Sequence, residues 1–346
     1  MNARSLPLGR RDDARLLGVA VRTGELRDGS ALDLPDWLTP GDVLVVNDAA
    51  TLPASLRAGD VEVRLATQTA DPLTWQAILL GAGSWRDDTD RRPAPPVLEV
   101  GEQLRFDDAF TARVVAVSTL SPRLVTLRFE VADAATLWAL LFRHGRPIQY
   151  SYLADDMPLE AMQTAYAGRP WAVEMPSAGR PLSWRVLNAL RARGVVIAAL
   201  THAAGPSASG DPRIDAALPL PERYELPAST VAAIAAARRR GGRVIAVGTS
   251  VVRALESSVR SDGSLVPGLR VTDLRLGPGS RRRVADGIIT NMHTPGESHF
   301  ELLQCFAPRS QLVETIEHAR ARGYRSHELG DISLIVPSLP ALAAAA

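Results

Sequence analysis

The spacing of apolar residues divides the chain into two kinds of segment. From about residue 60 to 131, apolar and polar residues alternate in short stretches, as in LVTLRFEV at 124–131. A period of two predicts strands with one solvated face. Stretches rich in Gly, Pro, Asp and Ser separate these strands, and one of them, 86–96, is expected to be a mobile loop. This part of the chain is therefore predicted to be all-β.

After residue 150, helical and strand patterns alternate. Residues 183–193 begin at Ser183, a favourable N-cap, and end at Gly194 before the apolar run VVIAAL. Residues 229–240 and 310–322 likewise end at glycines that precede the apolar runs RVIAV and ISLIV. Three repeats of helix, glycine and buried strand predict a largely parallel α/β layer.

An earlier apolar run, DVLVV at 42–46, is expected to be a strand of the same layer. The all-β segment then interrupts the α/β segment. We therefore predict an α/β fold with a mixed or parallel sheet, or a barrel-like variant of it, over residues 1–57 and 140–346. A small all-β barrel is expected as an insertion over residues 58–139.

Composition excludes several kinds of chemistry. All 39 basic residues are arginine, so Schiff-base catalysis and a Walker-A phosphate loop, which need lysine, are excluded. The single cysteine, Cys305, cannot form an internal disulfide or a cysteine-based metal site. A net charge of +1 does not by itself indicate a nucleic-acid binder. No apolar run long enough to span a membrane and no signal peptide are present, so a cytoplasmic protein is expected.

Polar clusters follow several of the predicted strands. In an open α/β sheet, ligands bind beyond the carboxyl ends of the strands, so several such clusters together favour a binding site. Taken singly, each cluster is more typical of an Asx-turn, a helix N-cap or a buried structural histidine than of a binding site. The clusters are Asn47-Asp48, Thr201-His202, Gly248-Thr249-Ser250, and Asp286 with Thr290-Asn291-Met292-His293.

Other site types fit the sequence poorly. His293, Glu297 and His299 lie close together, but Pro295 and Gly296 break the helical spacing that a metal site would need, so no metal is expected. A Gly-x-Ser-x-Gly nucleophile turn and a Gly-x-Gly-x-x-Gly dinucleotide loop are both absent from the sequence.

The same clusters belong to a longer series of motifs. The series consists of GDVLVVNDAATLPASL (41–56), QTAYAG (163–168), PSAG (176–179), ERYELP (222–227), GGRVIAVGTSVVRALES (241–257), VADGIITNMHTP (284–295) and GYRSHELGDISLI (323–335). In order and spacing, these stretches resemble the S-adenosylmethionine:tRNA ribosyltransferase-isomerase family of queuosine biosynthesis. The resemblance covers residues 40 to 335 or so.

The resemblance implies an α/β domain with an inserted β-barrel. The family reaction moves the ribosyl part of S-adenosylmethionine, a substrate here, onto the aminomethyl group of a 7-deazaguanine in tRNA. Adenine and methionine leave, and epoxyqueuosine forms. Such a site needs a base beside the sulfonium, a proton donor for adenine, and polar groups for the deazaguanine edge.

The matched motifs supply candidates for these roles. We expect His293 and His202 to move protons, because imidazole titrates near neutral pH. Glu222 and Asp48 complete the catalytic candidates, with Glu222 and Asn291 expected to contact polar ligand edges. The expected binding residues are Asn47, Ser177, Gly179, Gly248, Thr249, Ser250, Asp286, Thr290 and Asn291.

Four positions depart from the family pattern. Pro181 and Leu220 stand where the family has histidine, Ala50 replaces an arginine, and the 203–208 loop lacks a glycine and a phenylalanine. Two alternatives therefore remain open: a divergent paralogue that uses S-adenosylmethionine on another small acceptor, and a catalytically silent module that binds S-adenosylmethionine or RNA. The sequence does not set the oligomeric state, and a monomer is compatible with it.

Overall fold

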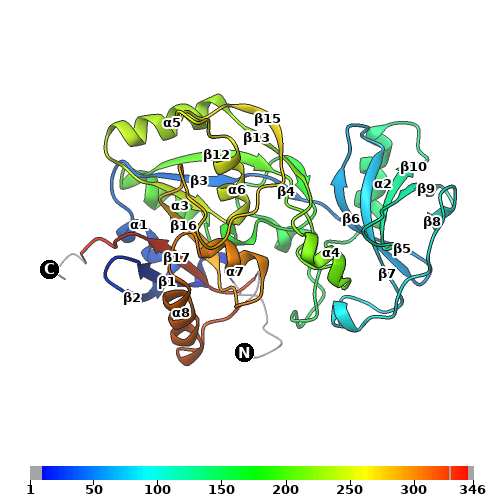
Figure 1. The fold of residues 1–346 in the computed structure, drawn as a ribbon, viewed down its shortest axis with the longest axis horizontal. Helices are drawn as coiled ribbons and strands as arrows, with labels where there is room; N and C mark the ends of the chain where they lie inside the picture. The colour runs from blue at the N-terminus through cyan, green and yellow to red at the C-terminus, as the bar shows by residue number, and fades with distance from the viewer. Residues whose placement is uncertain (1–9, 327–328, 342–346) are drawn as a thin grey trace.

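A computed structural model describes residues 10–326 and 329–341 of the chain, which form two lobes (Figure 1). The larger lobe is built on a nine-stranded mixed sheet with helices on both faces. The smaller lobe is an antiparallel six-stranded sheet formed by a segment between β3 and β11. The α/β fold with an all-β insertion, predicted from the spacing of apolar residues, is confirmed.

The four central strands of the large sheet run in the same direction. In spatial order the sheet consists of β15 (Gly268–Thr272), β13 (Glu222–Leu226), β12 (Val196–His202), β3 (Val43–Asn47), β14 (Val244–Val247), β16 (Gly287–Asn291), β17 (Ile332–Val336), β1 (Arg15–Ala20) and β2 (Glu25–Ser30). Strands β12, β3, β14 and β16 are mutually parallel, and their carboxyl ends therefore lie at one edge.

The last strand differs from the prediction of a largely parallel layer. Strand β17 pairs antiparallel with β16 and parallel with β1. Two helices, α7 (Ser298–Leu303) and α8 (Arg309–Ala321), connect β16 to β17, so the chain re-enters the sheet from the carboxyl edge. The helix-then-strand pattern alone does not distinguish this return from a parallel crossover.

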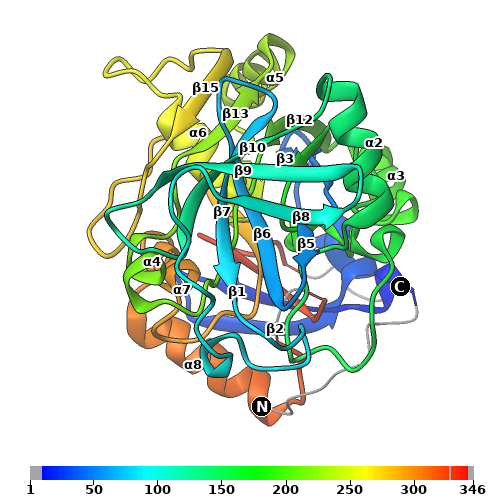
Figure 2. The same cartoon turned by 90° about the vertical axis from the view of Figure 1, so that its right-hand side faces the viewer.

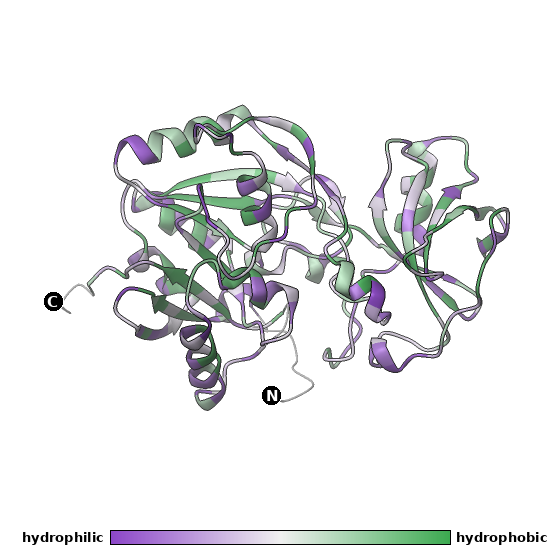
Figure 3. Ribbon diagram, in the orientation of Figure 1, coloured by the Kyte–Doolittle hydropathy of each residue, from purple (hydrophilic) through white to green (hydrophobic). Residues whose placement is uncertain are grey.

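Alternating residues of the central strands pack on two helical layers. Val43 and Val45 contact the core under α5 (Ala228–Arg239) and α6 (Thr249–Ser257), and Leu44 and Val46 face α3 (Trp184–Ala192). Figure 3 shows these strands largely in green, the colour of hydrophobic residues. Burial on both faces explains why the strands are continuous apolar runs. Ser183 caps α3 as predicted, since its hydroxyl accepts the N–H of Val186.

The inserted lobe is a nearly closed barrel that faces the viewer in Figure 2. Its strands, in spatial order, are β5 (Ser55–Ala58), β6 (Val61–Gln68), β7 (Thr74–Leu80), β10 (Leu124–Phe129), β9 (Phe110–Val117) and β8 (Gln103–Asp107). Strands β5 and β8, at the two ends of this order, approach each other. Helix α2 (Ala134–His144) packs on the barrel through Leu137 and Leu141.

Short elements connect the lobes and the layers. They are α1 (Leu34–Trp37), β4 (Ala50–Thr51), β11 (Pro170–Ala172), the 3-10 helix η5 (Ser177–Gly179) and α4 (Pro212–Ala217), together with the 3-10 helices η1 (Arg11–Asp13), η2 (Ala31–Asp33), η3 (Thr89–Arg91) and η4 (Leu159–Met162). Strands β4 and β11 form a separate parallel pair directly after Asp48.

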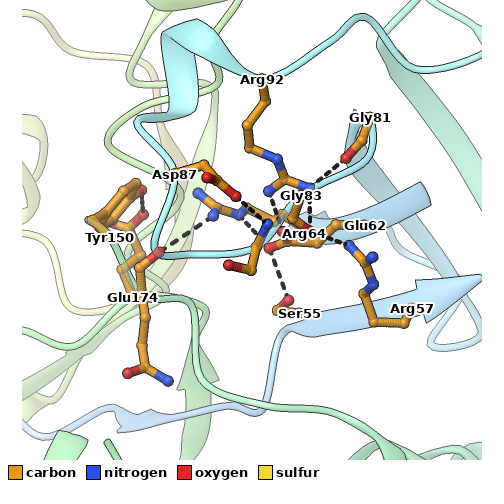
Figure 4. Close-up of polar contacts among 12 residues, drawn as sticks. Ser55, Arg57, Glu62, Arg64, Gly81, Gly83, Asp87, Arg92, Tyr150 and Glu174 are labelled. Atoms are coloured by element: carbon orange, nitrogen blue, oxygen red, sulfur yellow. Dashed lines mark hydrogen bonds and ion pairs between the residues drawn. The ribbon is translucent and has the colours of Figure 1, made fainter. Parts of the chain in front are cut away.

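A buried ion cluster lies where the barrel meets the large lobe (Figure 4). The Nε atom of Arg64 is 2.7 Å from Glu62, and the guanidinium of Arg92 contacts the other oxygen of the same carboxylate. Burial alone would raise the pKa of Glu62, but the two arginines lower it to about 2. Arg92 belongs to the stretch expected to be a mobile loop, yet its side chain is only 2% exposed. This ion pair fixes the interior of the stretch to the barrel.

Beside this cluster, Glu174 connects the barrel side to a loop of the large lobe. The hydroxyl of Tyr150 donates to Glu174, and the N–H of Ser207 donates to it over 3.0 Å. Burial raises the pKa of Glu174. Glu174 therefore anchors the 203–208 loop to the junction between the two lobes.

Candidate functional site

The carboxyl ends of four parallel strands bring the predicted clusters to one edge of the large sheet. Strand β3 ends at Asn47, β12 at His202 and β16 at Asn291, while β14 leads directly into Gly248. Because neighbouring strands are in register, these ends lie side by side. The sequence prediction that distant segments converge at this edge therefore agrees with the topology.

Asn47 joins β3, β12 and α6 at this edge. Its Nδ2 donates to the carbonyl of His202 over 2.9 Å and to the hydroxyl of Ser250 over 3.4 Å. Its Oδ1 accepts the N–H groups of His202 (2.8 Å) and Ala49 (3.1 Å). A side chain that uses all these bonds while 1% exposed holds its neighbours in fixed positions.

His202 is buried between two acceptors. Its Nδ1 lies 2.7 Å from the carbonyl oxygen of Ser250, and a carbonyl only accepts, so Nδ1 carries a proton. Its Nε2 lies 2.9 Å from Oε2 of Glu222. A proton on Nε2 makes this second contact favourable as well. The two atoms are within ion-pairing distance but do not form a hydrogen bond, so Nε2 has no hydrogen-bond partner among the described residues.

Glu222 lies between His202 and a second cation, Arg253. The guanidinium of Arg253 contacts Oε2, and the N–H of Gly205 donates to Oε1 over 2.6 Å. Burial alone would raise the pKa of Glu222, but the charge of Arg253 and the contact with His202 lower it to about 2. Glu222 is therefore ionised at neutral pH, and both of its oxygens already have partners.

A second group of polar side chains lies on the opposite face of the strands. Thr201 and His202 are consecutive in β12, so their side chains point to opposite faces. The hydroxyl of Thr201 donates to Asp48 over 2.5 Å. Ser177 of η5 donates to Oδ1 of Asn291 over 2.9 Å, while the buried Nδ2 of Asn291 has no partner within the described residues.

Tyr166 completes this second group. Its hydroxyl is buried and lacks a partner among the described residues, and burial together with the charge of Asp48 raises its pKa. A Cβ atom at Gly179 would lie 2.0 Å from that hydroxyl, so any other residue there would displace the Tyr166 side chain. The predicted binding residue Gly179 thus admits the Tyr166 side chain.

The Gly248-Thr249-Ser250 turn separates the two groups. Gly248 has φ of 90°, a conformation that favours glycine, and its N–H donates to the carbonyl of Ile289 over 2.8 Å. Thr249 and Ser250 begin α6 and are partly exposed. One turn further along α6, Arg253 points at Glu222.

His293 lies just beyond β16, beside a second histidine. The rings of His293 and His299 stack with centroids 4.7 Å apart, and Nδ1 of His293 is 3.2 Å from Glu297. Burial and the neighbouring His293 lower the pKa of His299 to about 3, and the charges of Glu222 and Arg253 also act on His299. His293 and His299 therefore lie on the Glu222 side of the edge. Within residues 10–326 and 329–341, no group of three or more acidic, histidine or cysteine side chains is arranged to hold a metal ion.

Two predicted site residues lie apart from Asn291 in different ways. Asp286 precedes β16, so the length of the strand separates it from Asn291. Its carboxylate accepts the N–H of Val244, and its own N–H donates to the carbonyl of Val244, both over 2.8 Å, at the amino edge of the sheet. Thr290 is buried at the carboxyl edge, and alternation along β16 turns its side chain to the face opposite Asn291, the face of Ile288. The sequence grouped Asp286 with Asn291 because they are close along the chain. The extended strand between them places the two residues far apart in space.

Sequence reasoning missed three members of the edge. Arg253, Tyr166 and His299 all lie within or beside the quoted motifs. Arg253 follows Thr249 by four residues, and that helical spacing could have indicated it. The neighbours of Tyr166 come from distant segments, so spacing gave no signal for it, whereas His299 stacks on His293 only six residues before it.

The positions that depart from the family pattern surround this edge. Ala50 lies in β4, Pro181 follows η5, and Leu220 lies just before β13. The altered 203–208 loop keeps defined contacts, since Gly205 donates to Glu222 and Ser207 to Glu174. The loop thus forms hydrogen bonds to both carboxylates.

Comparisons with known proteins agree with the geometry. A family model described as queuosine biosynthesis protein matches residues 2–335. S-adenosylmethionine:tRNA ribosyltransferase-isomerase of Acidiphilium cryptum is 35% identical over 344 residues, covering 95% of this chain and 94% of the relative. The enzyme of the same name from Thermus thermophilus is 36% identical over 341 residues, covering 94% and 93%.

A solved structure has the same fold. The crystal structure of S-adenosylmethionine tRNA ribosyltransferase from Thermotoga maritima aligns with a TM-score of 0.52 at 23% identity, covering 96% of this chain and 95% of that one. At this identity the likeness supports the fold alone. With the family match and the relatives above, the chain belongs to the queuosine biosynthesis protein family, the family of the S-adenosylmethionine:tRNA ribosyltransferase-isomerases.

Proposed function

We propose that the protein transfers and isomerises the ribosyl group of S-adenosylmethionine onto a 7-aminomethyl-7-deazaguanine base in tRNA. The products are epoxyqueuosine in tRNA, adenine and methionine. The observation that supports this most is the buried His202–Glu222–Arg253 cluster at the carboxyl edge of a chain that aligns with its relatives over nearly its whole length.

In this proposal, His202 donates a proton to the departing adenine. Its Nε2 makes no hydrogen bond within the described residues and can donate to a ligand, while the carboxylate of Glu222, 2.9 Å away, stabilises the charged ring. Glu222 then acts by positioning His202, because both carboxylate oxygens are already engaged. This role differs from the contact with a ligand edge expected from the sequence.

His293 is the proposed base that removes the proton beside the sulfonium. It is partly exposed, and Glu297 orients its ring through Nδ1. His299 is unsuited to this role, because its pKa of about 3 makes it a weak base. Asn291, whose Nδ2 has no hydrogen-bond partner in the described part of the chain, and Asp48 are the proposed contacts for the polar edge of the deazaguanine, on the opposite face.

The test uses the full chain with S-adenosylmethionine and tRNA that carries the aminomethyl-deazaguanine. Adenine is measured by chromatography and the modified nucleoside by mass spectrometry. We expect both products from the wild type, and a loss of about 10²–10⁴-fold in turnover for His293→Ala, the usual contribution of a general acid or base. His144→Ala, a histidine of α2 in the barrel, is the matched control and should keep wild-type turnover.

Three results would contradict the proposal in different ways. Full turnover by His293→Ala would remove His293 from the mechanism. Adenine release without tRNA modification would indicate a different acceptor. Binding of S-adenosylmethionine without any release would indicate a silent module.

A further inference from the structure

A tryptophan flanked by two arginines lies beside the candidate site. Trp171, in β11, has the guanidinium carbon of Arg223 4.2 Å from its ring centroid and that of Arg169 5.3 Å away. Guanidinium groups are held over an indole ring by attraction to its electron-rich face. Trp171 thus holds two cations close together.

This cluster of Trp171, Arg169 and Arg223 lies on the Asp48 side of the sheet edge. Arg223 follows Glu222 in β13, so alternation turns its side chain to the opposite face from Glu222. Thr201 pairs with Glu225, which shares the face of Arg223. Strand β11 pairs with β4, directly after Asp48, and Arg169 responds to the charge of Asp48.

The two arginines differ in their partners. Arg169 pairs with Glu225. Arg223 has no carboxylate within ion-pairing distance in the described part of the chain, and its buried Nε atom has no hydrogen-bond acceptor there. Burial lowers the pKa of Arg223, so the charged form is incompletely stabilised by the protein. An oxyanion would supply both the missing charge and the missing acceptor.

The position of the cluster favours an anion that reaches the protein from outside. Gly168, Arg169 and Pro170 are exposed, and Trp171 is partly exposed, so the cluster lies at the rim. The N–H of Gly168 donates to the carbonyl of Asp48 over 2.8 Å, which ties this rim to the edge of the sheet. A polynucleotide that inserts one base at the edge must pass its backbone over such a rim.

We propose that Arg223, held by Trp171 and assisted by Arg169, binds a backbone phosphate of the RNA strand next to the modified base. This inference rests on the proposed function and names the surface through which the tRNA is recognised. A carboxylate, such as that of the methionyl group of S-adenosylmethionine, has the same oxyanion chemistry. The experiment therefore measures the two substrates separately.

The experiment measures binding of substrate tRNA by fluorescence anisotropy across a series of KCl concentrations. For Arg223→Ala we expect the Kd for tRNA to rise about tenfold at low salt. The slope of log K against log salt should become smaller by about one, as for the loss of one phosphate contact. Trp171→Ala should weaken binding in the same direction, and Arg105→Ala, an exposed arginine of the barrel that pairs with Asp108, should bind as the wild type does.

Affinity for S-adenosylmethionine, measured by calorimetry on the same variants, should not change. Two outcomes would overturn the inference: an unchanged tRNA affinity and salt slope in Arg223→Ala, or a weakened affinity for S-adenosylmethionine in place of tRNA. Thermal unfolding of each variant shows whether it is folded, and Arg223→Lys, which keeps the charge, should recover part of the salt slope. Failure of the proposed function would show in the wild type itself, as absent adenine release or absent tRNA binding.

Discussion

Glu62 and Glu222 are both buried carboxylates that lie between two cationic side chains, yet they do different things. Glu62 contacts Arg64 and Arg92 inside the barrel junction, and Glu222 contacts Arg253 and His202 at the edge of the large sheet. The pKa of each is lowered to about 2 by its cations against the effect of burial. A perturbed carboxylate therefore does not by itself identify a functional site.

The partners and the location distinguish the two clusters. Both cations around Glu62 are arginines, which keep their charge at any physiological pH. One cation at Glu222 is a histidine, which can give up a proton. The Glu222 cluster also lies beyond the carboxyl ends of parallel strands, where α/β sheets bind ligands, whereas the Glu62 cluster fixes the barrel junction. A cluster that transfers protons needs a partner that can change its charge, whereas a cluster that only stabilises the fold does not.

The largest expected difference is in activity. Glu222→Gln should lower turnover by about 100-fold or more, because the protonated form of His202 loses its carboxylate. Glu62→Gln should keep turnover per folded molecule near that of the wild type. Adenine release, normalised to the folded fraction from circular dichroism, measures both.

Both variants should also lose stability. Removing one charge of a buried pair leaves the other uncompensated, at a typical cost of about 3–5 kcal/mol. Equal losses of turnover in Glu62→Gln and Glu222→Gln would erase the distinction between the two clusters.

Acid should act on the two clusters alike. Each carboxylate has a pKa of about 2 when folded, below the usual 4.5, so its contribution is complete above pH 4.5 and is lost as the pH falls toward 2. The loss is about 3 kcal/mol per group. Denaturant unfolding at a series of pH values should show a weaker acid dependence in Glu62→Gln and in Glu222→Gln.

Glu174→Gln is the control for this pH dependence. Burial raises the pKa of Glu174, so protonation favours the folded state and this group gains stability as the pH falls through its raised value. Its removal should leave the acid-induced loss in place. An acid dependence that is identical in the wild type and all three variants would contradict the assignment.

The smallest expected effect comes from replacing an arginine with lysine. Arg253→Lys keeps a charge near Glu222 but loses the planar guanidinium that also donates to the carbonyl of Leu274. We expect about a tenfold loss of turnover, through a less firmly held Glu222. Arg64→Lys in the barrel should lower the melting temperature and leave turnover unchanged. A drop in turnover for Arg64→Lys would mean that the barrel junction acts on the site.

Sequence patterns predicted most of the fold, because each element depends on local spacing. The apolar runs 42–46 and RVIAV became β3 and β14, and Ser183 caps α3 as expected. The direction of β17 was missed, since a strand pattern carries no information on whether the chain returns parallel or antiparallel. Arg92 was missed for a similar reason: a polar stretch looks solvated until a distant carboxylate such as Glu62 is placed beside it.

The candidate site shows the same division. The motifs indicated Asn47, His202, Gly248 and Asn291, which do lie at one edge, and Glu222, which joins them through His202. They also grouped Asp286 with Asn291, although the strand between them carries the two residues to opposite edges. Proximity along the chain predicts proximity in space within a turn or a helix, and fails across a strand.

The sequence by itself determined the helices and strands and which strands end in polar residues. It also excluded reactions that need a lysine side chain. Only the tertiary structure decided that His202 and Glu222 lie on one face and Thr201, Asp48 and Arg223 on the other. It also decided which cation contacts which carboxylate. The physical reason is that burial and charge pairing depend on contacts between segments that are far apart in the chain, and no local pattern contains them.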